Sequence, residues 1–231
     1  MSCFYFCFFL LIFVFKVLGF RSRIEQQGDQ KQFEGIIPPE AMAVGRVSNR
    51  FVEEYQETPP QQDYLAYYDK RQQEYRSTTG QFVWNVKERG YFTMQTPCSR
   101  AAVGFNAGKE LALGNIRYRL DQQNPFAVML LTSLEKGVSL DETSRAFVTL
   151  VSRARNTGMS YDDQSSRLIN KGKAPLLMES VSARLRLPRP ARIHLLDHRG
   201  MRTGKEIKPV KGNIFYLDGS NGTIYYEIEY L

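Results

Sequence analysis

From residue 79 onward, apolar residues occur in short runs separated by Gly, Asn and Asp. Two runs, residues 116–120 (IRYRL) and 184–187 (RLRL), alternate strictly between basic and apolar positions. Such a period of two places successive side chains on opposite faces of a β-strand. The pattern therefore predicts an all-β protein. The expected strands cover residues 81–86, 91–96, 100–105, 116–120, 126–132, 145–154, 175–178, 181–187, 192–196, 213–217 and 223–230.

Strands that follow one another so closely are typical of antiparallel β-sandwiches, either immunoglobulin-like or jelly-roll-like. We expect one or two of them, with a first region over residues 77–160 and a second over residues 161–231. The nearly continuous apolar run at 126–132 indicates a strand buried on both faces. Asn221-Gly222 predicts a type I′ hairpin between the last two strands.

The first 19 residues form a hydrophobic leader. All thirteen residues from Cys3 to Phe15 are apolar, which is short for a bilayer span of about 20 residues but fits a signal peptide. Val17 and Gly19 are small enough to precede a cleavage site before Phe20. The basic residues follow the apolar run, however, which is the reverse of the order in an export signal and would favour a cytoplasmic C-terminal side if the segment stayed as an anchor. A third interpretation is that the natural start lies downstream. The leader predicts a secreted, periplasmic or membrane-anchored protein, and membrane contact only through residues 3–20 if they are not cleaved.

Residues 20–76 read as a connector rich in Gln and Pro, with Pro-Pro pairs at 38–39 and 59–60 that interrupt regular structure. A strand is compatible with residues 43–52. Residues 63–76 predict a tyrosine-rich amphipathic helix that docks on another surface or forms a platform for sugars. We expect residues 24–60 to be the least ordered part after the leader, because they offer few aliphatic side chains for burial.

The net charge of +7 is unevenly distributed. Residues 24–76 sum to −4 and residues 77–231 to +8, and residues 183–211 hold nine basic groups against two acids. A basic face is therefore a candidate for anion binding. Its candidate residues are Arg184, Arg186, Arg189 and Arg192. The alternation at 184–187 equally fits a strand that simply points its arginines to solvent, and nucleic acid is not an expected partner.

The chain contains no phosphate-binding loop, dinucleotide fingerprint, HExxH helix or GxSxG elbow. Without the leader only Cys98 remains, so no intrachain disulfide can form. His194 and His198 flank Asp197 at a strand end, where the two rings do not converge on a metal as they would on a helix. We therefore expect no metal and no cofactor.

Three sets of neighbouring acids are available for glycosidase chemistry, which needs two carboxyl groups on either side of the sugar bond. The sets are Asp141 with Glu142, Asp162 with Asp163, and Glu227 with Glu229. All of them are interpreted first as solvated acids, so no catalytic residue is assigned. Aromatic rings that stack on sugars are the other candidate feature. The carbohydrate-contact candidates are Trp84, Tyr91 and Tyr225, although Trp84 shares a strand face with Phe82 and a core position is the alternative we favour.

Several blocks in fixed order resemble a known region. They are STTGQFVWN (77–85), GYFTMQTPCSRAAVGF (90–105), LLTSLEKGVSLDETSRAFVTLVSRARNTGM (130–159), KGKAPLLMESVSARLRL (171–187) and the terminal LLDHRGMRTG, IFYLDG and YYEIEY. Together they resemble the C-terminal β region that follows the (β/α)₈ barrel in large secreted bacterial glycoside hydrolases and their uncharacterised relatives.

In such enzymes the catalytic acids lie on the barrel, and the residues ahead of position 76 are too few for a barrel of about 250 residues. The resemblance therefore carries no catalytic residue to this chain. It implies a non-catalytic accessory module in contact with a polysaccharide, the remnant of a truncated enzyme, or a domain that docks on a separate barrel chain. The alternatives are a small secreted glycosidase, with acids among Asp141, Glu142, Asp162 and Asp163, and a basic module that binds an anionic polymer.

Overall fold

The computed structural model describes residues 38–46, 63–162 and 167–231. The leader lies outside them, as do most of the residues expected to be least ordered. The chain divides into two compact units, residues 1–84 and residues 85–231. In the part of the chain that the structure describes, no helix has the length and apolar character needed to cross a membrane.

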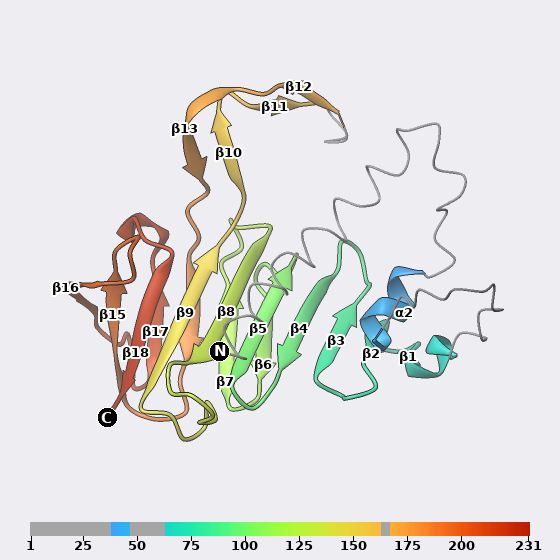
Figure 1. The fold of residues 1–231 in the computed structure, drawn as a ribbon, viewed down its shortest axis with the longest axis horizontal. Coiled ribbons are helices and arrows are strands. Elements are labelled where there is room, and N and C mark those ends of the chain that lie inside the picture. The colour runs from blue at the N-terminus through green and yellow to red at the C-terminus, as the bar shows by residue number, and fades with distance from the viewer. Residues whose placement is uncertain (1–37, 47–62, 163–166) are drawn as a thin grey trace, which may run out of the picture. The chain divides into compact units, whose positions relative to one another are not determined.

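The first unit is small. Its elements are α2 (Pro39–Val44), the 3-10 helix η2 (Tyr64–Tyr67), β1 (Tyr68–Asp69), β2 (Glu74–Arg76) and β3 (Phe82–Asn85) (Figure 1). The proline at the start of α2 suits a first helical turn, where its missing N–H has no partner to lose. Because α2 includes Ala43 and Val44, the beginning of the strand expected at 43–52 is helical instead.

The prediction of a helix over residues 63–76 was wrong. The Asp63 side chain caps η2 by accepting from the Leu65 N–H at 3.0 Å, and the chain then extends into β1. The Asp69 carboxylate accepts from the amides of Arg71 and Gln72, which forms a turn, and β2 returns antiparallel to β1. Tyrosines at 64, 68 and 75 fit a helical face only approximately, and pairing between strands prevailed over that pattern.

The second unit confirms the all-β prediction. Its larger sheet has the strand order β4-β5-β8-β9-β18-β15-β16, and its smaller sheet has the order β17-β14-β7-β6. All neighbouring strands in these two orders pair antiparallel. The strands of the larger sheet are β4 (Tyr91–Gln95), β5 (Ser99–Gly104), β8 (Ala127–Ser133), β9 (Arg145–Val151), β18 (Tyr225–Tyr230), β15 (Ala191–Leu196) and β16 (Arg202–Ile207). Those of the smaller sheet are β17 (Ile214–Leu217), β14 (Ala183–Arg186), β7 (Ile116–Leu120) and β6 (Glu110–Leu113).

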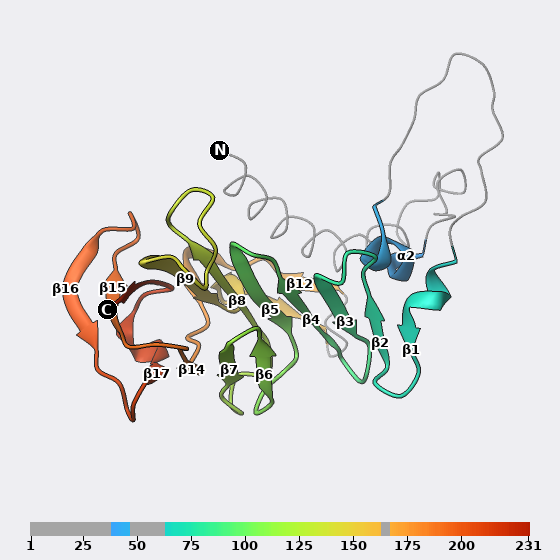
Figure 2. The same ribbon diagram turned by 90° about the horizontal axis from the view of Figure 1, so that it is seen from below.

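The two sheets enclose one hydrophobic core, with the smaller sheet along one face of the larger (Figure 2). The largest side chains in it include Tyr118, Phe215 and Tyr226, each about 1% exposed. Strands from both expected sandwich regions contribute to this single core, so the second unit is one sandwich and not two joined near residues 160–175. As expected, β8 is buried on both faces over its first five residues.

The prediction of a hairpin at Asn221-Gly222 was wrong. The flanking strands β17 and β18 belong to different sheets and do not pair. Between them lies the 3-10 helix η3 (Gly219–Asn221), which the Asp218 side chain caps by accepting from the Ser220 amide. Only Gly222 has a positive φ, of 67°, whereas a type I′ turn needs positive φ at both central residues.

Between β9 and β14 the chain leaves the sandwich as a narrow arm (Figure 1). The arm pairs β10 (Ala154–Thr157) with β13 (Lys173–Met178) and β11 (Ser160–Tyr161) with β12 (Leu168–Asn170). Six of the eleven exposed large hydrophobic side chains among the described residues belong to this arm. They are Tyr161, Leu168, Ile169, Leu176, Leu177 and Met178. The expected division of the chain near residues 160–175 thus corresponds to an excursion from one domain.

Candidate functional site

Aromatic rings from three strands of the first unit meet around Tyr75. The ring of Tyr68, its direct partner across β1 and β2, lies 4.6 Å away between centroids. Trp84 on β3 lies 6.2 Å away and Tyr64 on η2 lies 6.4 Å away, with interplanar angles of 30–37° for the three pairs. We call Tyr64, Tyr68, Tyr75 and Trp84 the aromatic cluster. All four side chains are half-buried, so each keeps part of its surface accessible.

The environment of Tyr75 shows that the cluster is partly desolvated. The pKa of the Tyr75 hydroxyl is raised by burial, with smaller contributions from the nearby Glu40 carboxylate and from Tyr68 and Tyr64. A hydroxyl that stays protonated retains its donor, and the rings supply apolar surface. Partly exposed rings edged by hydroxyl groups are suited to sugars, which present C–H faces and hydroxyl edges.

Trp84 is therefore not in the core, contrary to the interpretation favoured from its strand neighbours: it is half-buried and absent from the buried core cluster. Tyr91 and Tyr225 do not form one site. Tyr91 packs against the core on the inner face of the larger sheet, with the Lys109 ammonium 5.5 Å above its ring. Tyr225 stands on the outer face, 5.5 Å from the ring of Phe147.

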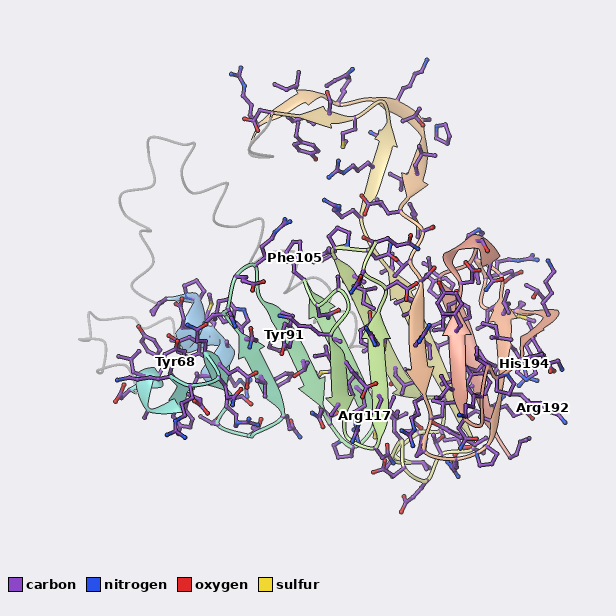
Figure 3. The ribbon with its side chains drawn as sticks, turned by 180° about the vertical axis from the view of Figure 1, so that it is seen from behind. Tyr68, Tyr91, Phe105, Arg117, Arg192 and His194 are labelled. Carbon is purple, nitrogen blue, oxygen red and sulfur yellow. The ribbon has the colours of Figure 1, made fainter. Side chains whose placement is uncertain are left out.

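The four arginines that were candidates for an anion-binding face do not lie on one surface. Arg184 and Arg186 lie exposed on the outer face of the smaller sheet. Arg192 stands on β15 of the larger sheet, beside Glu229 in the register. Arg189 is tied to the connection between the sheets, where it donates to the Thr143 carbonyl and lies 4.1 Å from the Tyr230 ring. Figure 3 shows Arg192 on β15, well away from Arg117 on β7.

The structure adds two arginines that sequence reasoning missed. Arg119 is the direct cross-strand partner of Arg184, and Arg117 is the partner of Arg186. The strict alternation in IRYRL indicated that both side chains share a face of β7, but nothing local indicated which strand lies beside it. We call Arg117, Arg119, Arg184 and Arg186 the arginine tetrad.

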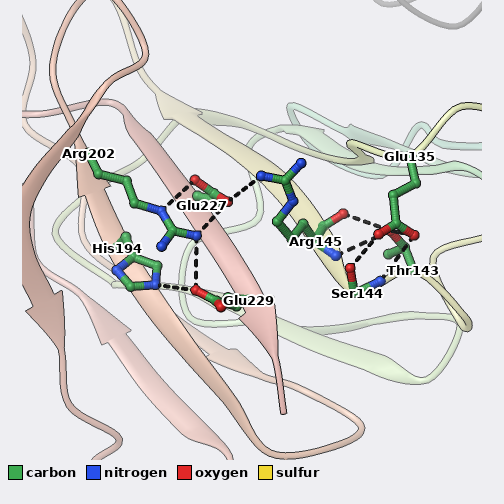
Figure 4. Close-up of polar contacts among 8 residues, drawn as sticks. All are labelled: Glu135, Thr143, Ser144, Arg145, His194, Arg202, Glu227 and Glu229. Atoms are coloured by element: carbon green, nitrogen blue, oxygen red, sulfur yellow. Dashed lines mark hydrogen bonds and ion pairs between the residues drawn. The ribbon is translucent and has the colours of Figure 1, made fainter.

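The carboxylate pair Glu227 and Glu229 lies in a network on the outer face of the larger sheet (Figure 4). Arg202 donates to both Glu227 oxygens, at 3.0 and 2.8 Å, and its Nη2 lies 2.9 Å from Glu229. His194 Nε2 lies 2.9 Å from Glu229, and Arg145 adds a looser contact to Glu227 at 3.7 Å. Glu227 is only 8% exposed, so its interpretation as a solvated acid was wrong.

These contacts decide what the pair can do chemically. Hydrogen bonds from Arg202 lower the pKa of Glu227, and hydrogen bonds from His194 and then Arg202 lower the pKa of Glu229. A glycosidase needs one acid whose pKa is raised so that it can donate a proton. The pKa shifts resolved for carboxyl groups in the described ranges are all downward. The network is therefore an arrangement of structural ion pairs.

The other described acids of these sets divide between the two ends of β9. Asp141 contacts the Asn115 amide at 2.8 Å and Arg100 at 3.8 Å, and Glu142 accepts from Ser139, all ahead of β9. Asp162 belongs to the arm, which follows the other end of β9. A strand of seven residues separates the two ends by about 20 Å. Asp163 lies outside the described residues.

The two histidines lie in different environments. His194 is buried on β15 between Glu229 and Glu206, whose Oε1 lies 3.5 Å from Nδ1, whereas His198 is exposed in the following turn. Asp197 organises that turn by accepting from the amides of Arg199 and Met201. Over the three described ranges, no three His, Cys, Asp or Glu side chains gather as a metal site would require.

No family model, no curated protein and no solved structure matches this chain.

Proposed function

We propose that the protein is a non-catalytic β-sandwich module of the kind associated with secreted bacterial glycoside hydrolases, and that it binds carbohydrate through the aromatic cluster. The observation that carries the proposal is the meeting of Tyr68, Tyr75 and Trp84 from three successive strands, each ring partly exposed. The sequence blocks at residues 77–187 and at the C-terminus support the association with glycoside hydrolases.

The arrangement of the acidic side chains also supports a binding role. Glu227 and Glu229 are held ionised by Arg202, and the acids before β9 lie far from Asp162 on the arm. A small glycosidase, the alternative enzyme reading, would need a proton donor facing a second carboxylate. Binding without turnover requires neither.

The proposal is tested by affinity electrophoresis of the full chain in gels that contain neutral polysaccharides, such as xyloglucan, mixed-linkage β-glucan or galactomannan. We expect retardation by at least one of them, and at least a tenfold loss of affinity in Trp84→Ala. Because the core of the second unit contains none of the cluster residues, the main melting transition should persist in that variant.

Tyr225→Ala is the matched control, since it removes another half-buried aromatic ring that is paired with Phe147. It should keep the wild-type retardation. The proposal fails if no gel retards the wild-type chain, if Tyr225→Ala loses binding while Trp84→Ala keeps it, or if the purified chain hydrolyses any of the glycans.

Export is the second part of the proposal, because a polysaccharide and a barrel chain of this class would be met outside the cytoplasm. It rests on the apolar leader in the sequence. A fusion of residues 1–30 to a reporter that is active only outside the cytoplasm should be active. Full-length, inactive fusion retained inside the cell would instead favour a natural start downstream.

A further inference from the structure

The outer face of the smaller sheet carries an unusual arrangement of like charges. Across β17, β14, β7 and β6 the register gives two rows of side chains on this face. One row is Tyr216, Arg184, Arg119 and Glu110, and the other is Ile214, Arg186, Arg117 and Ala112. The arginine tetrad thus fills the centre of the face, with a phenol ring and an aliphatic side chain at one edge.

Like charges directly opposite one another on neighbouring strands destabilise a sheet. Their side chains start about 5 Å apart across the strands and about 7 Å apart along them. Among the described residues, Arg119, Arg184 and Arg186 form no ion pair and donate no side-chain hydrogen bond, and Arg117 donates only to the carbonyls of Gly114 and Ile116. Glu110, the acid in the rows, makes no ion pair with the arginine opposite it.

Within the described part of the sheet, only Glu110 stands beside the tetrad in the register, next to Arg119 and without an ion pair, so most of the electrostatic cost remains and bound anions would offset it. Guanidinium groups bind carboxylates and sulfates through pairs of parallel N–H donors, and the strand register presents four of them on one face of the sheet. We propose that the arginine tetrad binds the acidic groups of an anionic polysaccharide, either uronate carboxylates or sulfate esters. This site lies on a different sheet from the aromatic cluster and does not depend on it.

The form of the surface favours a polysaccharide over a nucleic acid. The major groove of a duplex admits a helix or a two-stranded ribbon, whereas the tetrad lies at the centre of a four-stranded sheet. Sheets that bind single strands place aromatic rings at their centre so that bases can stack. Here the centre is occupied by arginine, and Tyr216 stands at the edge with its hydroxyl donating to Asp121 at 2.7 Å. Its ring and Ile214 remain as apolar borders for the faces of sugar rings.

The test compares two double variants that each remove two positive charges. Arg119→Gln/Arg184→Gln removes one cross-strand pair of the tetrad, and Arg192→Gln/Lys205→Gln removes two exposed cations from the larger sheet. Binding of the full chain is measured against polygalacturonate, dextran sulfate, neutral dextran and a 20-base-pair DNA duplex, at several salt concentrations.

We expect the wild type to bind polygalacturonate or dextran sulfate, but not neutral dextran. The tetrad variant should lose at least tenfold in affinity and show a shallower dependence on salt, and the control should change less than threefold. Equal losses of affinity in the two variants would show that binding depends only on the net charge of the protein. Tighter binding to DNA than to both charged polysaccharides would indicate a nucleic-acid surface. Either result overturns the inference, as does a wild type that binds no polyanion. Trp84→Ala should keep its affinity for the charged polymers, which separates this outcome from failure of the proposed function.

Discussion

The outer faces of the two sheets of the second unit differ in whether their charged side chains are paired. On the larger sheet, Glu227 is nearly buried and each arginine that approaches it meets a carboxylate. On the smaller sheet, Arg119 and Arg184 face each other with no acid between them. The first arrangement is complete within the chain, so its role is structural. The second is costly until something else binds, which distinguishes a candidate ligand surface from a solvated strand face.

The largest contrast between the faces should appear on removing one charge from each. Glu227→Ala leaves Arg202 and Arg145 without their shared carboxylate. Breaking a fully buried pair costs 3–5 kcal/mol, but Arg202 is 40% exposed and water can replace part of the loss, so we expect about 2 kcal/mol. Arg184→Ala should stay within about 0.5 kcal/mol of the wild type. Urea unfolding at neutral pH measures both, and equal losses would contradict the comparison.

The second-largest contrast should be in how the two faces contribute to the loss of folding stability at low pH. The pKa values of Glu227 and Glu229 are lowered in the folded protein, mainly by hydrogen bonds from Arg202 and His194. Their contribution to stability is therefore fully present above the ordinary glutamate pKa of about 4.3, and it is lost as the pH falls through the lower folded values.

In Glu227→Gln this part of the acid dependence should shrink, whereas Arg119→Gln/Arg184→Gln should keep it. Urea midpoints measured between pH 6 and pH 3 provide the comparison. A wild type and a Glu227→Gln variant with parallel pH profiles would show that the network does not sustain the shift.

The smallest effect should come from supplying the missing acid. In Arg184→Glu a carboxylate stands opposite Arg119, with Tyr216 as its neighbour on the other side, and opposite charges across strands stabilise by about 0.2–1 kcal/mol. Thermal unfolding should show a slightly raised midpoint at low salt, and the gain should fade as salt screens the pair. A lower midpoint would mean that Arg184 makes an interaction that the like-charge description omits.

The alternation of residues 116–120 and 184–187 correctly predicted two strands with arginines on one face. It did not predict that these strands are neighbours, because they are more than sixty residues apart and their pairing depends on the shared core. The same limit hid the Arg202 contacts of Glu227, since Arg202 comes from β16, with β15 between it and β18. Individual strands follow from local periodicity, whereas sites made between strands require the topology.

Local turn signals failed where tertiary structure overrode them. Asn221-Gly222 has the composition of a two-residue hairpin, yet the chain passes from one sheet to the other at this point. Residues 63–76 have tyrosines near a helical spacing, yet Tyr68 and Tyr75 pair across two short strands. That second error concealed the aromatic cluster, because a helix would have directed the rings toward a docking partner and away from Trp84.

The arm has a consequence for how this chain can vary in length. Its two ends meet: the Glu179 amide donates to the Arg153 carbonyl at 2.9 Å, and the two side chains form an ion pair at 3.1 Å. Among the residues that the structure describes between Leu150 and Val181, none belongs to the core cluster. An inserted segment that leaves and rejoins a scaffold at adjacent points can be shortened, lengthened or exchanged without rebuilding that scaffold. By this geometry the arm is the part of the second unit whose length can change while the sandwich stays the same.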